Sequence, residues 1–208
     1  MAGFFITFEG TEGCGKSTHI ERLADRLRGK GHAVCALREP GGTESGEQIR
    51  QLLKHGPKNL TAEAELLLMN ASRAQLVREV IRPSLEAGEI VLCDRFYDST
   101  TVYQGSGRGL DAARIRSVID FAVDGMQPDL TILLKIPLEI SEQRRANRRE
   151  SDRFESADRN FFRRIEAGYA ALAEAHPERI HVIDANRPLE IVQREIWATA
   201  SAAVKSCE

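Results

Sequence analysis

The chain has 208 residues, a length that fits one domain and that buries about 70% of the surface exposed by the unfolded chain. Its 42% hydrophobic and 29% charged residues are ordinary for a globular protein. A net charge of −2 gives no electrostatic basis for binding nucleic acid, because that affinity rests largely on a basic surface that neutralises phosphates. No repeat, low-complexity tract or linker divides the sequence, so we expect a single domain over residues 1–208.

The N-terminal segment MAGFFITFEG has no basic residues before its short apolar run, so neither a signal peptide nor a membrane span is expected. The four cysteines, at positions 14, 35, 93 and 207, lie far apart and form no CxxC pair. A structural zinc site needs clustered ligands, so free thiols in a reducing compartment are the better interpretation. We therefore expect a cytoplasmic protein that does not associate with a membrane.

Five short apolar runs predict β-strands. They are Phe4–Phe8, Ala33–Leu37, Ile90–Cys93, Leu130–Leu134 and Ile180–Ile183. These runs are too continuous for a sheet with one solvated face, and they suit a parallel sheet that is covered on both faces. Ligands of such sheets collect at the carboxyl ends of the strands.

Helical patterns lie between the predicted strands. One apolar stripe comprises Ile20, Leu23, Ala24 and Leu27, and a second comprises Ile115, Val118, Ile119 and Ala122. Asp111 and Gly125 bracket the second stripe as the expected cap and the expected stop. Strands that alternate with helices predict an α/β fold with right-handed crossovers, here a five-stranded parallel sheet with helices on both faces.

The first predicted strand runs directly into a phosphate-binding loop. The loop reads Gly10-Thr11-Glu12-Gly13-Cys14-Gly15-Lys16-Ser17, followed by Thr18, a full match to G-x-x-x-x-G-K-[ST]. Glycines let backbone N–H groups turn toward an anion, and the following helix presents its positive N-terminal end. Lys16 is placed to reach the β- and γ-phosphates of a nucleotide, and the Ser17 hydroxyl can ligate Mg²⁺. The alternative is a glycine-rich turn without a ligand, against which the preceding strand and the following amphipathic helix argue.

The residues after the third predicted strand, together with two missing motifs, indicate which class of nucleotide-binding protein this is. A GTPase would need DxxG and NKxD elements, and neither occurs in the chain. An ATPase motor commonly ends its acidic strand in Asp-Glu, whereas this strand is followed by Asp94 and Arg95. An arginine beside the nucleotide site suggests a second anion, such as the phosphate of an acceptor. The alternative is a salt bridge between Arg95 and Asp94.

Residues 144–153 contain five arginines among ten residues. On a helix the pairs Arg144/Arg148 and Arg145/Arg149 repel by roughly 0.2–0.5 kcal/mol each. That cost is understandable if a polyanion occupies this face of the helix part of the time. The alternative is a solvated, charged helix end. Downstream of a phosphate-binding loop, the segment predicts a mobile lid over approximately residues 143–156, which would exclude water when closed.

Several motifs together resemble the thymidylate kinases in order and spacing, over nearly the whole chain. They are Phe8-Glu9-Gly10, Arg38-Glu39-Pro40-Gly41-Gly42-Thr43, Ala71-Ser72-Arg73, Asp94-Arg95-Phe96, Tyr103-Gln104-Gly105, Pro-Asp-Leu-Thr at 128–131 and Asp152-Arg153-Phe154-Glu155. The resemblance implies a P-loop kinase that uses ATP and Mg²⁺ to phosphorylate dTMP to dTDP, in dTTP synthesis. It also implies a homodimer packed through helices, with the apolar run 66–68 either in that interface or in the monomer core.

The resemblance implies roles on the acceptor side of the site. Arg95 would clamp the dTMP phosphate through its planar guanidinium, and Arg73 would donate to the thymine base unless it is only an exposed helix charge. Tyr103 would place its ring against the sugar, leaving little room for a ribose 2′-OH. The other substrate contacts expected are Glu12, Arg38, Met69, Ser99, Thr100 and Gln104.

Acidic residues near the loop have a different expected role, because a carboxylate is repelled by a triphosphate. Glu12 would meet the deoxyribose 3′-OH or the metal region. Glu9 and Glu155 are further candidates for the same neighbourhood, or else structural ion-pair partners.

The resemblance also places the catalytic arginine in the lid. One subgroup of the family holds this arginine in the phosphate-binding loop, at the position that is Gly13 here, and a bacterial-type subgroup holds it in the lid. Charge neutralisation near the transferring group carries much of the rate of phosphoryl transfer. The expected catalytic set is Lys16, Arg95, Glu12 and the lid arginines Arg148, Arg144 and Arg153, with Arg148 foremost.

Two residues depart from the family pattern. Met69 stands where a phenylalanine usually stacks on thymine, and a methionine covers a ring through its polarizable sulfur but is less rigid. Lys135 follows the fourth predicted strand where an aspartate is common. Met69 leaves open a related nucleotide or deoxynucleoside kinase with another base preference. A nucleotide switch that hydrolyses slowly is a further alternative, which the missing DxxG and NKxD elements disfavour.

Overall fold

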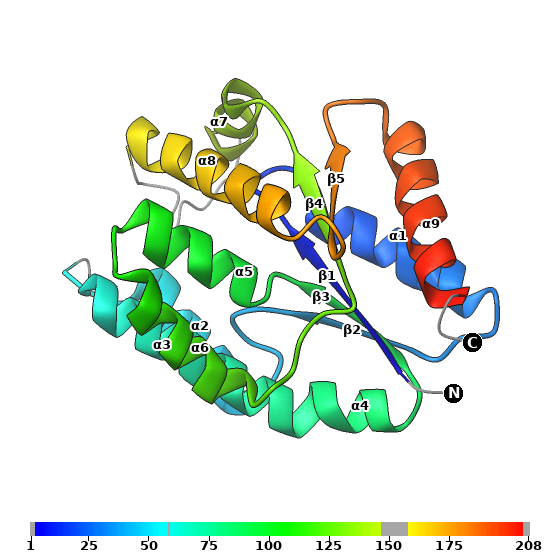
Figure 1. The fold of residues 1–208 in the computed structure, drawn as a ribbon, viewed down its shortest axis with the longest axis horizontal. Coiled ribbons are helices and arrows are strands. Elements are labelled where there is room, and N and C mark those ends of the chain that lie inside the picture. The colour runs from blue at the N-terminus through cyan, green and yellow to red at the C-terminus, as the bar shows by residue number, and fades with distance from the viewer. Residues whose placement is uncertain (1–2, 58, 147–157, 206–208) are drawn as a thin grey trace.

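The computed structural model describes residues 3–57, 59–146 and 158–205 and forms a three-layer α/β fold (Figure 1). Its sheet has five strands in the order β2-β3-β1-β4-β5, and every neighbouring pair is parallel. The strands are β1 (Phe4–Glu9), β2 (Val34–Arg38), β3 (Ile90–Asp94), β4 (Leu130–Lys135) and β5 (Ile180–Asp184). The predicted fold class is therefore confirmed, and each predicted strand lies within one residue of an observed one.

Helices cover both faces of this sheet. They are α1 (Lys16–Arg28), α2 (Glu44–His55), α3 (Ala62–Leu76), α4 (Arg82–Glu86), α5 (Tyr97–Thr100), α6 (Ala112–Val123), α7 (Leu138–Ala146), α8 (Arg159–Ala175) and α9 (Leu189–Lys205), with π-helical segments at Val77–Ile81 and Thr101–Gly107. Helices α1 and α9 pack side by side on one face, and α3 and α6 cover the other (Figure 1). All six residues of the central strand β1 are buried, as expected for a strand between two helical layers.

The two predicted helical stripes face the core. All four apolar residues of the first stripe are buried in α1. In α6, Asp111 caps the helix by accepting a hydrogen bond from the Arg114 amide, as predicted. The predicted stop at Gly125 directly follows the C-cap Asp124, and both residues have left-handed backbones, with φ angles of 76° and 50°. Aspartate tolerates this conformation better than most residues, so a glycine was not required there.

The strand register brings the predicted motifs to one edge of the sheet. Asp94, at the end of β3, pairs with Phe8 of β1 on one side and with Arg38 of β2 on the other. The phosphate-binding loop, the segment that starts at Arg38 and the residues after Asp94 therefore leave the sheet together, at its carboxyl edge. This is the edge where ligands of open α/β sheets bind.

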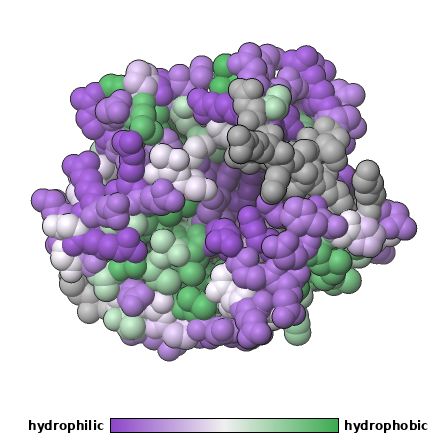
Figure 2. All heavy atoms as spheres, turned by 180° about the vertical axis from the view of Figure 1, so that it is seen from behind, coloured by the Kyte–Doolittle hydropathy of each residue, from purple (hydrophilic) through white to green (hydrophobic). Residues whose placement is uncertain are grey.

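The outer surface is mostly hydrophilic on the face seen from behind Figure 1, with apolar side chains in small groups between the polar ones (Figure 2). Within the described ranges, no helix is long and apolar enough to cross a membrane.

Candidate active site

The phosphate-binding loop joins β1 to α1 in a conformation that demands glycine. Gly10, Gly13 and Gly15 have φ angles of 132°, 79° and 96°, where a side chain would be strained. At Gly10 a Cβ atom would also collide with the carbonyl oxygen of Leu134 on β4. Gly15 is the N-cap of α1, so the loop leads into the positive end of a helix.

Lys16 and Ser17 lie on the first turn of α1. The Lys16 ammonium donates to the carbonyl oxygens of Gly10 and Thr11 at 3.1 and 3.2 Å. The side chain therefore lies against the phosphate-binding loop. The Ser17 hydroxyl donates to the Asp94 carboxylate at 2.8 Å. A hydroxyl beside a carboxylate is the hard-oxygen pair that suits Mg²⁺, an ion that keeps most of its shell for waters and phosphates. The described residues contain no cluster of three or more His, Cys, Asp and Glu that could hold a metal by themselves.

Arg95 reaches across from the end of β3. Its own backbone is left-handed (φ 72°), and its guanidinium donates to Glu12 at 2.9 Å, to Ser99 at 2.9 Å and to the hydroxyl of Tyr103 at 3.1 Å. The alternative of a salt bridge to Asp94 is therefore wrong, because the carboxylate partner of Arg95 is Glu12. The Arg95–Glu12 pair is 17% and 13% exposed, so an anion in the cavity can still reach it.

Glu12 has one satisfied and one unsatisfied oxygen. Its Oε1 accepts from Arg95 and from the Tyr103 hydroxyl, the latter at 2.7 Å. Its Oε2 is buried and has no hydrogen-bond partner among the described residues. A buried carboxylate oxygen without a donor is rare in native proteins and points to a donor supplied by a ligand.

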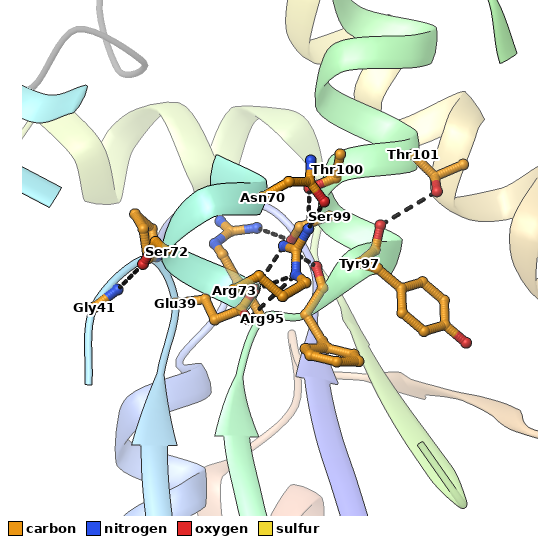
Figure 3. Close-up of polar contacts among 12 residues, drawn as sticks. Glu39, Gly41, Asn70, Ser72, Arg73, Arg95, Tyr97, Ser99, Thr100 and Thr101 are labelled. Atoms are coloured by element: carbon orange, nitrogen blue, oxygen red, sulfur yellow. Dashed lines mark hydrogen bonds and ion pairs between the residues drawn. The ribbon is translucent and has the colours of Figure 1, made fainter. Parts of the chain in front are cut away.

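Arg73 is the centre of a buried polar cluster (Figure 3), and the alternative of an exposed helix charge is wrong, because the side chain is 2% exposed. Its Nε and Nη2 atoms donate to the Glu39 carboxylate at 2.9 and 2.6 Å, and Nη2 also donates to the Phe96 carbonyl. Its Nη1 atom donates to Asn70 and Thr100 at 3.0 and 2.9 Å. These contacts engage all five N–H groups of the guanidinium.

No role was expected for Glu39 from the sequence, although the residue belongs to the motif Arg38-Glu39-Pro40-Gly41-Gly42-Thr43. The carboxyl group is fully buried, and burial raises its pKa to about 7 in spite of the neighbouring Arg73, with Glu9 adding to the rise. Glu39 precedes Pro40, and its partner Arg73 lies 34 residues later in the sequence. No local sequence pattern connects two residues so far apart, so the pair could not be predicted.

Glu9 is a third buried carboxylate. It accepts hydrogen bonds from the Phe96 amide at 2.8 Å and from the hydroxyls of Ser99 and Tyr169 at 2.6 and 2.8 Å. Burial first, and then Asp98, raise the pKa of this carboxyl. Its contacts hold the chain after β3 in place, which makes Glu9 a support of the segment that carries Arg95. Tyr169, on α8, was not found from the sequence.

One cavity of about 500 Å³ collects most of the predicted residues. The predicted residues that line it are Glu12, Gly13, Gly15, Lys16, Ser17, Thr18, Arg38, Met69, Arg73, Arg95, Ser99, Thr100, Tyr103, Gln104 and Arg144. It is also lined by Glu39, Pro40, Arg50, Lys54 and Asp94. Gly10 and Thr11 line a separate cavity behind the loop, and the Cys14 side chain is buried in the core.

The described part of the predicted lid lies on α7, which touches the phosphate-binding loop. Arg144 donates to the Gly13 carbonyl at 2.8 Å, and Ser141 donates to the Glu12 carbonyl at 2.7 Å. Arg145 turns away and stacks on the Phe162 ring, 3.6 Å from its centroid. Arg148, Arg149, Arg153 and Glu155 lie outside the described residues.

The fold and this cavity define a P-loop protein in which Arg95 lines the same cavity as the phosphate-binding loop. A model of the family described as thymidylate kinase matches residues 8–196. The chain is 48% identical to the thymidylate kinase of Deinococcus radiodurans, with 96% of this chain and 97% of that protein covered. It is 45% identical to the thymidylate kinase of Pseudomonas putida, over 100% of this chain and 99% of that one.

A solved structure agrees with these sequence comparisons. The crystal structure of thymidylate kinase from Ehrlichia chaffeensis superposes with a TM-score of 0.79 at 33% identity, covering 96% of this chain and 99% of that chain. The chain belongs to the thymidylate kinase family. The resemblance predicted from the residues is thus confirmed.

Proposed function

We propose that the protein is an ATP-dependent kinase that phosphorylates dTMP to dTDP. The observation that carries the proposal is that Lys16, of the phosphate-binding loop, and Arg95, after β3, line the same cavity. Two cationic groups in one cavity suit two phosphorylated molecules placed end to end. Membership of the family supports the choice of dTMP as the acceptor.

Transfer in this site needs positioning more than acid–base chemistry. A phosphate oxygen of dTMP attacks the γ-phosphorus in line, the bond from that phosphorus to the β–γ bridging oxygen breaks, and ADP leaves. The attacking oxygen is already anionic, so no strong general base is required. Lys16 exchanges its two loop carbonyls for phosphate oxygens, which are the stronger acceptors because they are charged.

Ser17 and Asp94 would hold Mg²⁺, with ATP-binding residues 10–18 around the phosphates. The ion, when bound, neutralises the β- and γ-oxygens. The Ser17 hydroxyl donates to the Asp94 carboxylate, so the two side chains that would hold the ion lie side by side.

On the acceptor side, Arg95 would bind the dTMP phosphate and Glu12 would bind the 3′-OH through its unsatisfied oxygen. The incoming phosphate competes with Glu12 for Arg95, so substrate binding replaces an internal ion pair with an external one. Tyr103 would contact the sugar. Arg38, Ser99 and Thr100 add polar contacts from the same wall.

The base would lie between Met69 and Arg73. Because the five N–H groups of Arg73 are engaged, a direct hydrogen bond to thymine requires Thr100 or Asn70 to release one of them. Met69 lines the cavity and would cover the ring.

The lid over approximately residues 143–156 would supply the arginine that stabilises the transition state. We expect Arg148 to dominate, with Arg144 and Arg153 beside it. Arg144 already touches the loop at Gly13, where a side chain would be crowded against its Cβ atom at 3.0 Å. The contact between Arg144 and Gly13 supports the proposal that the lid supplies an arginine next to the phosphate-binding loop.

A cytoplasmic homodimer completes the proposal. Helix α3 packs against both α2 and α6, and each of these three helices exposes a large apolar side chain: Leu52 at 42%, Leu67 at 58% and Phe121 at 81%. Large apolar side chains exposed on neighbouring helices are typical of an interface. Leu66 is buried in the core, so of the apolar run 66–68 it is Leu67 that is offered to a partner.

An ATP-coupled assay against several acceptors tests the proposal. The panel is dTMP, dUMP, UMP, dCMP, dGMP, AMP and thymidine, each with Mg²⁺ and ATP. We expect the highest kcat/KM for dTMP and none for thymidine, which has no acceptor phosphate. A higher kcat/KM for another monophosphate would show that dTMP is not the preferred acceptor, but the protein would still be a kinase.

A further inference from the structure

A partly buried ion pair lies outside the set of residues predicted to touch the substrate. Glu65 of α3 is 1% exposed, and its carboxylate pairs with Arg108 at 3.2 Å. The same carboxylate accepts a hydrogen bond of 2.7 Å from Nε2 of Gln104. Arg108, Glu65 and Gln104 therefore form a chain of contacts that ends at a residue of the cavity wall.

This chain of contacts decides which end of the Gln104 amide faces the cavity. A carboxylate has only acceptors, so the amide must present its NH₂ group to Glu65 and keep its carbonyl oxygen for the other side. Oε1 of Gln104 takes no hydrogen bond from any described residue, although the side chain is 1% exposed. This oxygen is therefore an acceptor in the cavity wall that a donor of a ligand can reach.

Thr100, which lines the same cavity, offers a hydrogen-bond donor where Gln104 offers an acceptor. Its hydroxyl oxygen accepts from Arg73 at 2.9 Å, so its proton is left to be donated. The wall thus presents a fixed acceptor, Gln104, and a donor, Thr100. Thymine and uracil offer a ring N–H beside a keto oxygen, whereas cytosine offers an unprotonated ring nitrogen beside an amino group.

We propose that Glu65, held by Arg108, is a positioning residue that fixes the carbonyl of Gln104 toward N3 of the base, where thymine donates a proton and cytosine has only a lone pair, and thereby makes the site reject cytosine. This inference rests on the proposed function, since it assigns the base-binding part of the same cavity. Glu65 itself does not touch the substrate. Its effect passes through the orientation of one amide group.

The test compares kcat/KM for dTMP and dCMP in the full-length enzyme and in Glu65→Gln. The new amide can donate to Gln104 as well as accept from it, so Gln104 can turn its NH₂ group toward the base. We expect the dTMP/dCMP ratio to fall on the order of tenfold, with the KM for ATP close to that of the wild type. Glu63→Gln, an exposed acid two residues earlier on α3, is the matched control and should leave the ratio unchanged.

A double-mutant cycle separates orientation from general loosening of the wall. In a Gln104→Ala background, Glu65→Gln should no longer change the dTMP/dCMP ratio. An undiminished effect in that background would overturn the proposal, because Glu65 would then act without Gln104. An unchanged ratio in Glu65→Gln alone would overturn it as well.

Two further outcomes have a defined meaning. If Glu65→Gln does not fold, Gln104→Ala decides: the proposal requires the dTMP/dCMP ratio to fall in that variant and fails if the ratio is kept. If the wild type does not phosphorylate dTMP at all, the proposed function fails. A wild type that is active on dTMP with a ratio insensitive to these changes refutes only the role of Glu65.

Discussion

At the scale of single residues, the arginines on the acceptor wall are held by carboxylates that the protein itself supplies. Arg95 is paired with Glu12, and Arg73 with Glu39. Removing one partner of a buried pair leaves an uncompensated charge, which is strongly destabilising. The two pairs differ in access, since Arg95 can exchange its partner for a phosphate whereas the N–H groups of Arg73 are all engaged within the protein. We infer that the first pair serves binding and the second serves the shape of the pocket.

Lys16→Ala should lower kcat on the order of a hundredfold or more, because the ammonium neutralises charge on the phosphates during transfer. The Tm should change little, since the two carbonyls that the ammonium contacts lie in a loop. Lys30→Ala, an exposed lysine just after α1, removes the same charge away from the cavity and is the control. A near-normal kcat in Lys16→Ala would remove the phosphate-binding loop from the mechanism.

Glu39 should make stability depend on pH. Its pKa rises from an ordinary value of 4.5 to about 7 on folding, so the folded state binds the proton more tightly. Stability from this group is therefore present at low pH and lost as the pH rises between these two values, by at most about 3 kcal/mol. Urea unfolding at about pH 5 and about pH 8 should show this loss in the wild type. The loss should be smaller in Glu39→Gln, and an equal slope in the two proteins would contradict the assignment.

Tyr103→Phe tests how the site discriminates against a ribose. The ring is nearly buried and its hydroxyl donates to Glu12, so the variant keeps the bulk and loses the hydrogen bond. We expect the preference for dTMP over its ribose counterpart to persist, measured as the ratio of kcat/KM values. Loss of the preference would assign it to the hydroxyl.

At the scale of elements, the sequence predicted those features that depend on residues close together in the chain. The strands, the glycine loop and the cap at Asp111 follow from residues adjacent in the sequence. The Arg73–Glu39 pair joins residues 34 apart, and the Glu65–Gln104 contact joins residues 39 apart. Such pairings depend on how α3 packs beside the chain after β3, which no periodicity encodes. The same holds for the π-helical turn at Thr101–Gly107, whose extra residue per turn has no signature in the sequence.

The lid is the element whose contribution to the rate is largest in our proposal. Arg148→Ala should lower kcat far more than it raises the KM for either substrate, because a contact made only in the transition state does not affect substrate binding. Arg144→Ala should act in the same direction but less. Arg163→Ala, an exposed arginine of α8, controls for the change in net charge. A pure increase in KM would show that the lid only binds.

At the scale of the whole molecule, the apolar side chains on α2, α3 and α6 predict an assembly. Phe121→Glu should convert a dimer into a monomer in sedimentation experiments, because burying the new carboxylate in an apolar interface is unfavourable. Val182→Glu places the same charge on an exposed apolar position of β5, away from these helices, and should leave the dimer intact. A dimer that survives Phe121→Glu would place the interface elsewhere.

The central claim joins one phosphate cradle and one acceptor site in the same cavity, and the fate of the transferred group tests it most directly. ATP labelled in its γ-phosphate is incubated with the enzyme, Mg²⁺ and dTMP, and the labelled products are separated. We predict that the label appears in dTDP, with little inorganic phosphate, and that Lys16→Ala forms far less labelled dTDP in the same time. Label found mainly in inorganic phosphate, with or without dTMP, would contradict a kinase and favour a nucleotide-hydrolysing switch.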